Sequence, residues 1–328
     1  MCGGTFANRL MTRIHQVGTP LCLGLDPVLG AIETQMGPGG MLDLQRAGIP
    51  TDDPPKDGRD QAVRLIESFC FQVLQEVSDH VAAVKIQVAF FEAYGAPGWA
   101  ALERTVSRAR DLGLVVLADA KRGDIDSTAC AYKWAFFGGA PYLDGTRSKG
   151  LGVDALTVHP YLGLEALDPL FRACEEEGAG LYCLARTSNP GGDWIQDRCQ
   201  QDVPAYLELS RRLLQLQENR PGLAGGLCLV VGATMPAALS RLVSEWSLLP
   251  LLLPGVGAQG ASANEIARAL QSHPGPHLVP ISRAILYPEA GSGLEGIKAA
   301  VHRFRKELQP MTAAERPCPK AMIEGIPS

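Results

Sequence analysis

The chain has 328 residues, of which 46% are hydrophobic, so it can bury a large core in one α/β barrel or in two smaller domains. Its net charge of -5 gives no general attraction to nucleic acid or to anionic lipid. We therefore expect no nucleic-acid partner and no membrane partner, and an anionic substrate would need local positive groups to hold it.

The nine cysteines are scattered and form no Cys-x-x-Cys pair, and several fall inside apolar runs. This pattern is typical of small buried side chains in a reducing compartment. The first residues lack an apolar segment followed by a small-residue cleavage site, and no stretch approaches 18 uncharged apolar residues. We predict a cytoplasmic protein without disulfide bonds.

Segments of helical and of strand periodicity alternate along the chain after an N-terminal helix over residues 6–17. The predicted strands cover residues 21–26, 81–86, 114–119, 154–159, 180–185, 227–231, 250–253 and 277–281. The predicted helices that follow cover residues 61–77, 96–112, 127–137, 162–177, 202–217, 236–247, 262–271 and 294–308. Eight alternations predict the α/β class and a (β/α)8 TIM barrel, as a single domain over residues 1–308.

Three segments fall outside this alternation. Residues 27–59 are rich in Gly, Pro and Asp and are predicted as a loop insertion. Residues 138–152 are predicted as a Gly-rich loop that carries Arg147 and Lys149. Residues 309–328 contain prolines and little periodicity, so we expect a flexible tail.

The third predicted strand runs directly into a group of alternating charges, Asp119-Ala-Lys121-Arg-Gly-Asp124. Alternate residues on a strand share a side, so Asp119 and Lys121 can both point into the mouth of the barrel. In such a barrel the C-terminal ends of all strands open onto one face. Polar residues at those ends could therefore converge, namely Asp26, Lys85, Asp119, Lys121, His159, Ser188 and Arg283.

Acids and lysines in one partly dry pocket favour each other's charged forms. For an isolated Asp-x-Lys-x-x-Asp pattern, a structural network of ion pairs at a strand end is favoured over a catalytic site. His159 lies on an apolar strand and is expected to be a packed or hydrogen-bonded barrel residue. No cluster of His, Cys and acidic residues in the sequence suggests a zinc site.

A Gly-rich turn over residues 253–260 favours a functional site over a purely structural ion-pair network, because its N–H groups and the following helix could cradle a phosphate. Its glycines, Gly255, Gly257 and Gly260, fit the G-x-G-x-x-G pattern of dinucleotide sites. That motif normally opens its domain and expects an acid about 20 residues later. Here it comes late, and Arg283 ends the next strand, so we favour a phosphomonoester.

Several motifs together resemble one family. They are Leu23-Gly-Leu-Asp-Pro27, Val84-Lys-Ile-Gln-Val-Ala-Phe-Phe-Glu-Ala-Tyr-Gly95, Asp119-Ala-Lys-Arg-Gly-Asp-Ile125, Thr157-Val-His-Pro-Tyr-Leu-Gly163, Thr187-Ser-Asn-Pro190 and Pro254-Gly-Val-Gly-Ala-Gln-Gly260. In this order they resemble orotidine 5'-phosphate decarboxylase, and most of all its longer-chain bacterial subgroup, type 2. The combination is specific, although each short motif alone is not.

The resemblance implies decarboxylation of orotidine 5'-phosphate to UMP and CO2, without a metal or an organic cofactor. Lys121 would protonate C6 of the pyrimidine, Asp119 would lie beside the departing carboxylate, and Lys85 and Asp124 would complete the charged array. A homodimer is implied, because Asp124 and Thr128 would reach the partner's ribose site. The other implied substrate contacts are Asp26 to ribose, Ser188 to the pyrimidine, and Gln259 and Arg283 to the phosphate.

Two alternatives stay open at this point. A related barrel could use Mg²⁺ to stabilise an enediolate formed from a sugar phosphate, and EDTA would then abolish its activity. A non-catalytic barrel could bind a phosphosugar, but it would need only the phosphate loop and Arg283. The full set of Lys85, Asp119, Lys121 and Asp124 favours an enzyme.

Overall fold

The computed structural model describes residues 4–40, 55–200, 202–245, 249–271, 273, 275–289 and 293–312. Its main sheet contains eight parallel strands in the order β10-β1-β2-β3-β4-β5-β8-β9. The strands are β1 (Leu21–Leu25), β2 (Ala83–Gln87), β3 (Val115–Arg122), β4 (Ala155–Val158), β5 (Gly180–Arg186), β8 (Leu227–Val231), β9 (Leu251–Leu252) and β10 (Val279–Ile281).

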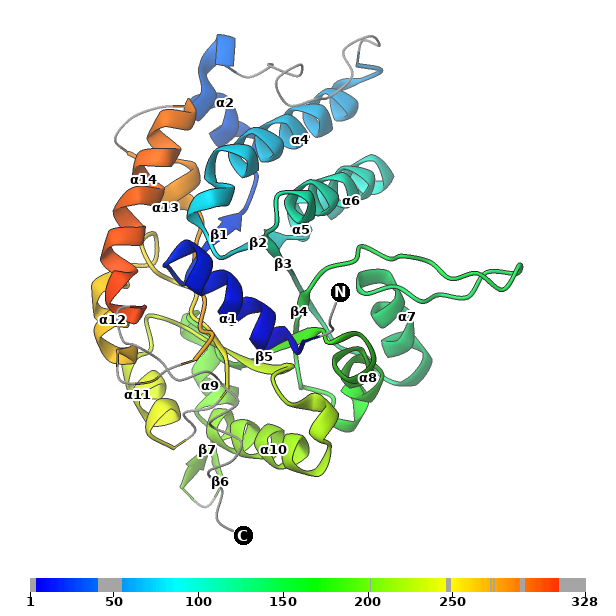
Figure 1. The fold of residues 1–328 in the computed structure, drawn as a ribbon, viewed down its shortest axis with the longest axis vertical. Coiled ribbons are helices and arrows are strands. Elements are labelled where there is room, and N and C mark those ends of the chain that lie inside the picture. The colour runs from blue at the N-terminus through cyan, green and yellow to red at the C-terminus, as the bar shows by residue number, and fades with distance from the viewer. Residues whose placement is uncertain are drawn as a thin grey trace.

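The sheet closes into a ring between β9 and the residue that precedes β10. The N–H of Leu278 donates to the carbonyl of Leu251 at 2.7 Å, and the N–H of Leu253 donates to the carbonyl of Leu278 at 2.9 Å. On the other side, β10 pairs in parallel with β1, with Leu21 opposite Val279. The predicted (β/α)8 barrel is therefore confirmed (Figure 1).

Helices surround this ring, and most of the longer ones return the chain to the start of the next strand (Figure 1). Each strand can be apolar on both faces because helices cover the outside and side chains fill the inside. The longer helices are α4 (Gly58–Val77), α6 (Gly95–Asp111), α7 (Asp126–Phe136), α8 (Asp168–Glu177), α10 (Ala205–Asn219), α11 (Pro236–Glu245), α12 (Ala263–Leu270) and α14 (Gly293–Leu308). Short helices are α5 (Ala89–Glu92), α9 (Asp193–Gln196) and α13 (Arg283–Leu286).

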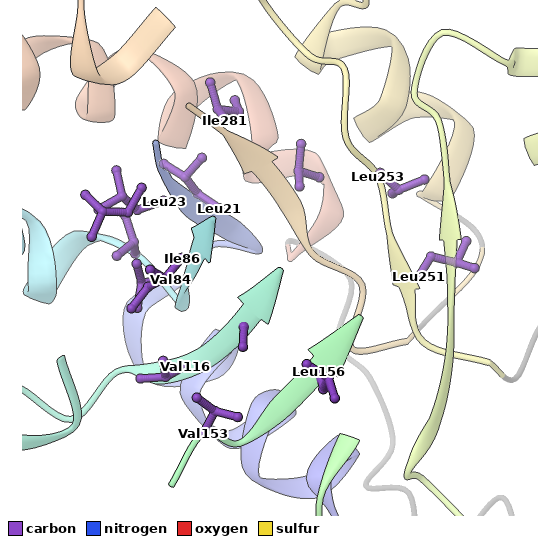
Figure 2. Packing of buried hydrophobic residues seen from close by; sticks show 14 of the residues in the cluster. Leu21, Leu23, Val84, Ile86, Val116, Val153, Leu156, Leu251, Leu253 and Ile281 are labelled. Carbon is purple, nitrogen blue, oxygen red and sulfur yellow. The ribbon is translucent and has the colours of Figure 1, made fainter. Parts of the chain in front are cut away.

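The outer core lies between the strands and this layer of helices. Alternate strand residues such as Leu23, Val84, Val116 and Leu156 point into it and are almost completely buried (Figure 2). This alternation fixes which residues of each strand face the helices and which face the barrel interior.

The helix α1 (Phe6–Val17) closes the N-terminal end of the barrel, and its bounds match the prediction. Its apolar residues recur at helical spacing, so Phe6, Leu10 and Ile14 share one buried face. That face packs on inward-pointing strand residues, including Tyr182, whose ring meets Phe6 edge to face at 5.8 Å. The helix ends at Gly18, in the left-handed conformation that favours glycine.

The prediction of a loop throughout residues 27–59 is wrong for Leu29–Gly40, which form helix α2. Residues 41–54 lie outside the described residues. Ile32 on α2 is fully buried in the outer core, and this anchor compensates for the glycines and the proline at the end of the helix. Leu29 and Met36 also pack against this core, at helical spacing with Ile32. This pattern is short and runs into glycines and a proline, so the sequence did not reveal the helix.

Two further differences concern the segments after β5 and α14. The chain forms α9 and a small hairpin of β6 (Cys199–Gln200) and β7 (Val203–Pro204) before α10 begins, none of which was predicted. Met311 is buried and Thr312 Oγ1 donates to the carbonyl of Gly18, so the predicted flexible tail is wrong for its first residues. The rest of that tail, from residue 313, lies outside the described residues.

Residues 138–152 form an extended hairpin beside α7 (Figure 1). Pro141 bridges Arg147 in antiparallel fashion, and backbone hydrogen bonds join the two arms from Gly139 to Ser148. Among the helices that the structure describes, none is long and apolar enough to cross a membrane.

Candidate active site

The C-terminal ends of the strands surround a cavity of about 320 Å³. Its walls come from residues on all eight strands of the main sheet, from the loops after β5 and β9, and from the start of α13. Seven of the predicted catalytic and substrate-binding residues line it together: Asp26, Lys85, Asp119, Lys121, Ser188, Gln259 and Arg283. This convergence follows from the parallel barrel, because the seven residues are far apart in sequence.

Asp119 is the centre of the polar network. Its Oδ2 accepts from Lys85 Nζ at 2.6 Å and from Gln87 Nε2 at 3.3 Å. Its Oδ1 accepts from Lys121 Nζ at 2.6 Å and from the hydroxyl of Thr157 at 2.9 Å. Only 9% of the Asp119 side chain is exposed, so four donors replace the water that the carboxylate has lost.

Lys85 and Asp119, the two buried charged residues of this network, stabilise each other's charged forms. Burial alone would raise the pKa of Asp119, but the charges and hydrogen bonds of Lys85 and Lys121 outweigh it, so the pKa lies well below the ordinary value. Burial alone would lower the pKa of Lys85, but the carboxylates of Asp119 and Asp26 outweigh it and the pKa is raised. The pair is therefore a fixed dipole at neutral pH.

Lys121 has a different exposure from Lys85. Its side chain is 48% exposed, whereas that of Lys85 is 9% exposed. Its backbone has φ of 50°, in the left-handed region that non-glycine residues rarely adopt. The register of β3 with β4 shifts at this point, so the strand end turns and presents the Lys121 ammonium at the mouth of the cavity.

Asp26 follows β1 and lies within electrostatic reach of Lys85. Its backbone is fixed by Tyr287, whose hydroxyl donates to the Asp26 carbonyl at 3.0 Å and accepts from the N–H of Val28 at 2.9 Å. Asp26 Oδ1 is buried and has no hydrogen-bond partner among the described residues. A ligand hydroxyl at this place would satisfy it.

The Gly-rich turn after β9 forms another part of the cavity wall. Gly255 lines the cavity with φ of 113°, and a Cβ there would come within 3.0 Å of Gln259 Oε1. Gly257 and Gly260 do not line the cavity: their N–H groups donate to Ala261 and Gly257 carbonyls within the turn. These two glycines shape the turn, while Gly255, Gln259 and Arg283 face the cavity.

The loop after β5 carries Ser188 and is fixed by hydrogen bonds of Arg186 and by close packing on Gly232. Arg186 forms two hydrogen bonds to Asp197, at 2.7 and 2.9 Å, and donates to the Thr187 carbonyl. Gly232 permits a close approach, because a Cβ there would lie 2.9 Å from Ser188 Cα. These contacts fix the loop at the edge of the cavity.

The structure does not bring every predicted residue into this cavity. Asp124 and Thr128 lie outside it on the same chain, and Asp124 Oδ1 accepts from the N–H of Ile125. His159 packs against Gly123, as expected of a barrel residue, and lines a neighbouring cavity of about 860 Å³. That larger cavity contains none of the Lys85, Asp119 and Lys121 array, so we place the chemistry in the smaller one.

Sequence reasoning missed two members of the network. Gln87 follows Lys85 by two residues on β2, and this spacing puts both side chains on one side of the strand. Thr157 precedes His159 by two residues in a motif already noted for its resemblance. The alternation of strand residues was therefore a usable signal for Gln87, whereas the contact from Thr157 depends on the irregular register of β3 and β4.

The described residues contain no group of three or more His, Cys, Asp or Glu side chains placed to hold a metal ion. The seven cysteines among them are all free, and five are buried.

Comparison with known proteins gives consistent matches. The family model described as orotidine 5'-phosphate decarboxylase / HUMPS family matches residues 19–290. Orotidine 5'-phosphate decarboxylase of Rhodopirellula baltica is 35% identical over 285 residues, which cover 86% of this chain and 88% of that protein. The enzyme of the same name from Roseiflexus castenholzii is 38% identical over 289 residues, covering 88% and 90%.

Solved structures agree in fold. The structure of Leishmania donovani OMP decarboxylase has a TM-score of 0.67 at 26% identity and covers 95% of this chain and 100% of that one. The crystal structure of a Streptomyces avermitilis protein assigned as orotidine 5'-phosphate decarboxylase has a TM-score of 0.72 at 32% identity, with 96% and 98% covered.

Proposed function

Since the chain belongs to the orotidine 5'-phosphate decarboxylase / HUMPS family, it is a carboxy-lyase that converts orotidine 5'-phosphate to UMP and CO2 in pyrimidine biosynthesis, and we propose that Lys121 is its proton donor. The observation that carries this proposal is the Lys85–Asp119–Lys121 array at the C-terminal end of the barrel, with both lysine Nζ atoms 2.6 Å from the Asp119 carboxylate.

The chemical problem is the carbanion left at C6 when the bond to the carboxylate breaks. The pyrimidine ring delocalises this charge poorly, so an ammonium already placed at C6 is the natural stabiliser and proton source. Lys121 suits this role because it lies at the cavity mouth and is the more exposed of the two lysines. CO2 leaves as the C6 electron pair takes a proton from Lys121 Nζ.

Lys85 and Asp119 form the rigid part of the Lys85–Asp119–Lys121 array. Asp119 orients both ammonium groups and lies beside the place where the substrate carboxylate leaves. Because the pair is buried and already ordered, it needs little reorganisation during the reaction. Lys85 in turn keeps Asp119 ionised after Lys121 has given up its proton.

The other walls of the cavity bind the rest of the nucleotide. Asp26 accepts hydrogen bonds from ribose hydroxyls, and Ser188 contacts the pyrimidine edge. Gln259 and Arg283 bind the phosphate beside Gly255, since a guanidinium can make two parallel hydrogen bonds to phosphate oxygens. Binding energy from this remote phosphate supports catalysis at the base.

The proposal includes a homodimer in which Asp124 and Thr128 enter the partner's site. Their position outside the cavity of their own chain, near the exposed Ile125, supports this arrangement. Asp124→Asn and Lys121→Ala subunits, each inactive alone, should regain partial activity when mixed, because one composite site keeps both wild-type groups. Absence of recovery in verified heterodimers would contradict the shared site.

A cytoplasmic location and a reaction without metal or organic cofactor complete the proposal. To test the function, the ultraviolet absorbance of orotidine 5'-phosphate is followed with purified full-length protein, with and without EDTA. Equal turnover in both samples supports cofactor-free decarboxylation. Loss of turnover with EDTA would favour metal-dependent chemistry, and no turnover in either sample, from folded protein, would favour a phosphosugar-binding barrel.

A further inference from the structure

Thr157 on β4 makes three hydrogen bonds with one hydroxyl. It is 1% exposed, and its Oγ1 donates to Asp119 Oδ1 at 2.9 Å. The same oxygen accepts from the N–H of Ala120 at 3.1 Å and from the N–H of Lys121 at 3.0 Å. A hydroxyl has one donor and two acceptor lone pairs, so this one is completely used.

Two of these hydrogen bonds support the backbone that carries Lys121. The register of β3 with β4 shifts between Ala118 and Arg122, and Lys121 has φ of 50°. A non-glycine residue keeps such a conformation only when its surroundings fix it. Thr157 Oγ1 accepts from the N–H groups of Ala120 and Lys121 at this irregular turn. It therefore fixes the backbone from which the Lys121 side chain extends.

The third hydrogen bond concerns the carboxylate. Asp119 Oδ1 is shared by the Thr157 hydroxyl and by Lys121 Nζ, at 2.9 and 2.6 Å. When Lys121 turns to C6 and gives up its proton, Oδ1 loses a cation. The hydroxyl is neutral and lies on a strand, so it stays on Oδ1 throughout this movement. A side chain without a hydroxyl would leave Oδ1 buried and without that donor.

We propose that Thr157 is a positioning residue for the decarboxylation, which keeps Asp119 and Lys121 in their working geometry through its hydroxyl. The inference rests on the proposed function and deepens it. It predicts that the hydroxyl matters for the rate of the chemical step and matters little for binding of the nucleotide.

The test compares two variants of the full-length enzyme. Thr157→Val has nearly the same shape without the hydroxyl, and Thr157→Ser keeps the hydroxyl. We expect Thr157→Val to lower kcat by about 10- to 100-fold with a change in KM below about threefold, because the lost contact acts in the transition state. Thr157→Ser should stay within about threefold of the wild type, and UMP binding should be similar in all three proteins.

The pH profile gives a second readout that a merely structural role would not move. A hydrogen bond to a carboxylate favours its charged form, so removal of this donor raises the pKa of Asp119. The acid limb of the kcat profile should therefore move to higher pH in Thr157→Val and stay in place in Thr157→Ser.

A Thr157→Val enzyme with wild-type kcat and an unmoved acid limb would overturn the inference, as would equal losses in both variants. If Thr157→Val does not fold, Thr157→Cys replaces it, because a thiol is of similar size and a much weaker donor. Absence of turnover in the wild type would contradict the proposed function itself, whereas wild-type turnover with no effect of these variants contradicts only the role of Thr157.

Discussion

The two ends of the barrel are built on the same eight strands and bury opposite kinds of side chain. At the N-terminal end, Leu10 and Ile14 of α1 pack on apolar strand residues such as Cys228. At the C-terminal end, Lys85 and Asp119 are almost as deeply buried, but they are charged. The comparison shows that one fold can bury either kind of group, provided that each charge has partners.

The two ends differ in what burial contributes. Each fully buried aliphatic side chain stabilises the fold by about 1.5–3 kcal/mol through the hydrophobic effect. A buried ion pair adds little net stability, because the cost of removing both charges from water offsets their attraction. We therefore expect substitutions at the N-terminal end to lower stability alone, and most substitutions at the C-terminal end to lower the rate.

The largest effect should come from Lys121→Ala. Turnover of orotidine 5'-phosphate should fall by at least about 1,000-fold, in the range of lost general acid catalysis. The melting temperature should change little, because Asp119 keeps Lys85, Gln87 and Thr157 as donors. Lys121→Arg serves as the control for charge, since a guanidinium keeps the cation and is a very weak acid. Near-normal turnover in Lys121→Ala would exclude it as the proton donor.

Asp119→Asn should be the exception at the C-terminal end, because it removes the carboxylate that is hydrogen-bonded to the buried Lys85 ammonium. Removing one partner of such a pair costs about 3–5 kcal/mol in the free energy of unfolding. The pKa of Asp119 is lowered from 3.8, so its contribution is complete above that pH and is lost as the pH falls further. Denaturant unfolding from pH 6 to pH 3 should show the wild-type advantage shrinking below about pH 4. A constant difference would contradict this assignment.

Leu10→Ala tests the opposite end. The side chain is fully buried, so the free energy of unfolding should fall by about 3 kcal/mol, while kcat stays within about twofold. Gln16→Ala on the exposed side of the same helix is the matched control and should change neither quantity. A large loss of kcat in folded Leu10→Ala would show that the two ends are coupled.

The smallest effect should come from Gln87→Leu. Its contact with Asp119 Oδ2 is 3.3 Å long, and Lys85 occupies the same oxygen at 2.6 Å. We expect a decrease in kcat of only about threefold, well below the effect of Thr157→Val, because a stronger donor remains. A loss as large as that of Thr157→Val would mean that the two neutral donors contribute equally.

Much of this arrangement could be predicted from the sequence, because periodicity locates strands and a parallel barrel brings their C-terminal ends together. The bounds of α1 and the order of all eight strands followed in this way. So did the meeting of Lys85, Asp119 and Lys121, since strand alternation determines which side each residue faces.

What the sequence did not reveal depends on short elements and on local backbone contacts. Helix α2 is anchored by Ile32 within a Gly-rich segment, and the β6–β7 hairpin spans only a few residues. The role of Gly257 as a turn former, and the contact of Thr157 with Asp119, depend on local backbone geometry. Such details arise from register shifts and positive φ angles, which residue types alone do not specify.

The helix at the N-terminal end also has a consequence for synthesis on the ribosome. This helix is synthesised before the residues that cover its apolar face, which lie as late in the chain as Tyr182, Leu252 and Leu278. In the same way, β1 can pair with β10 only after β10 has been synthesised. Contacts between such distant parts of a chain form slowly. Phe6 and Leu10 therefore remain uncovered until most of the chain has been translated, and the nascent protein should depend on chaperones during that interval.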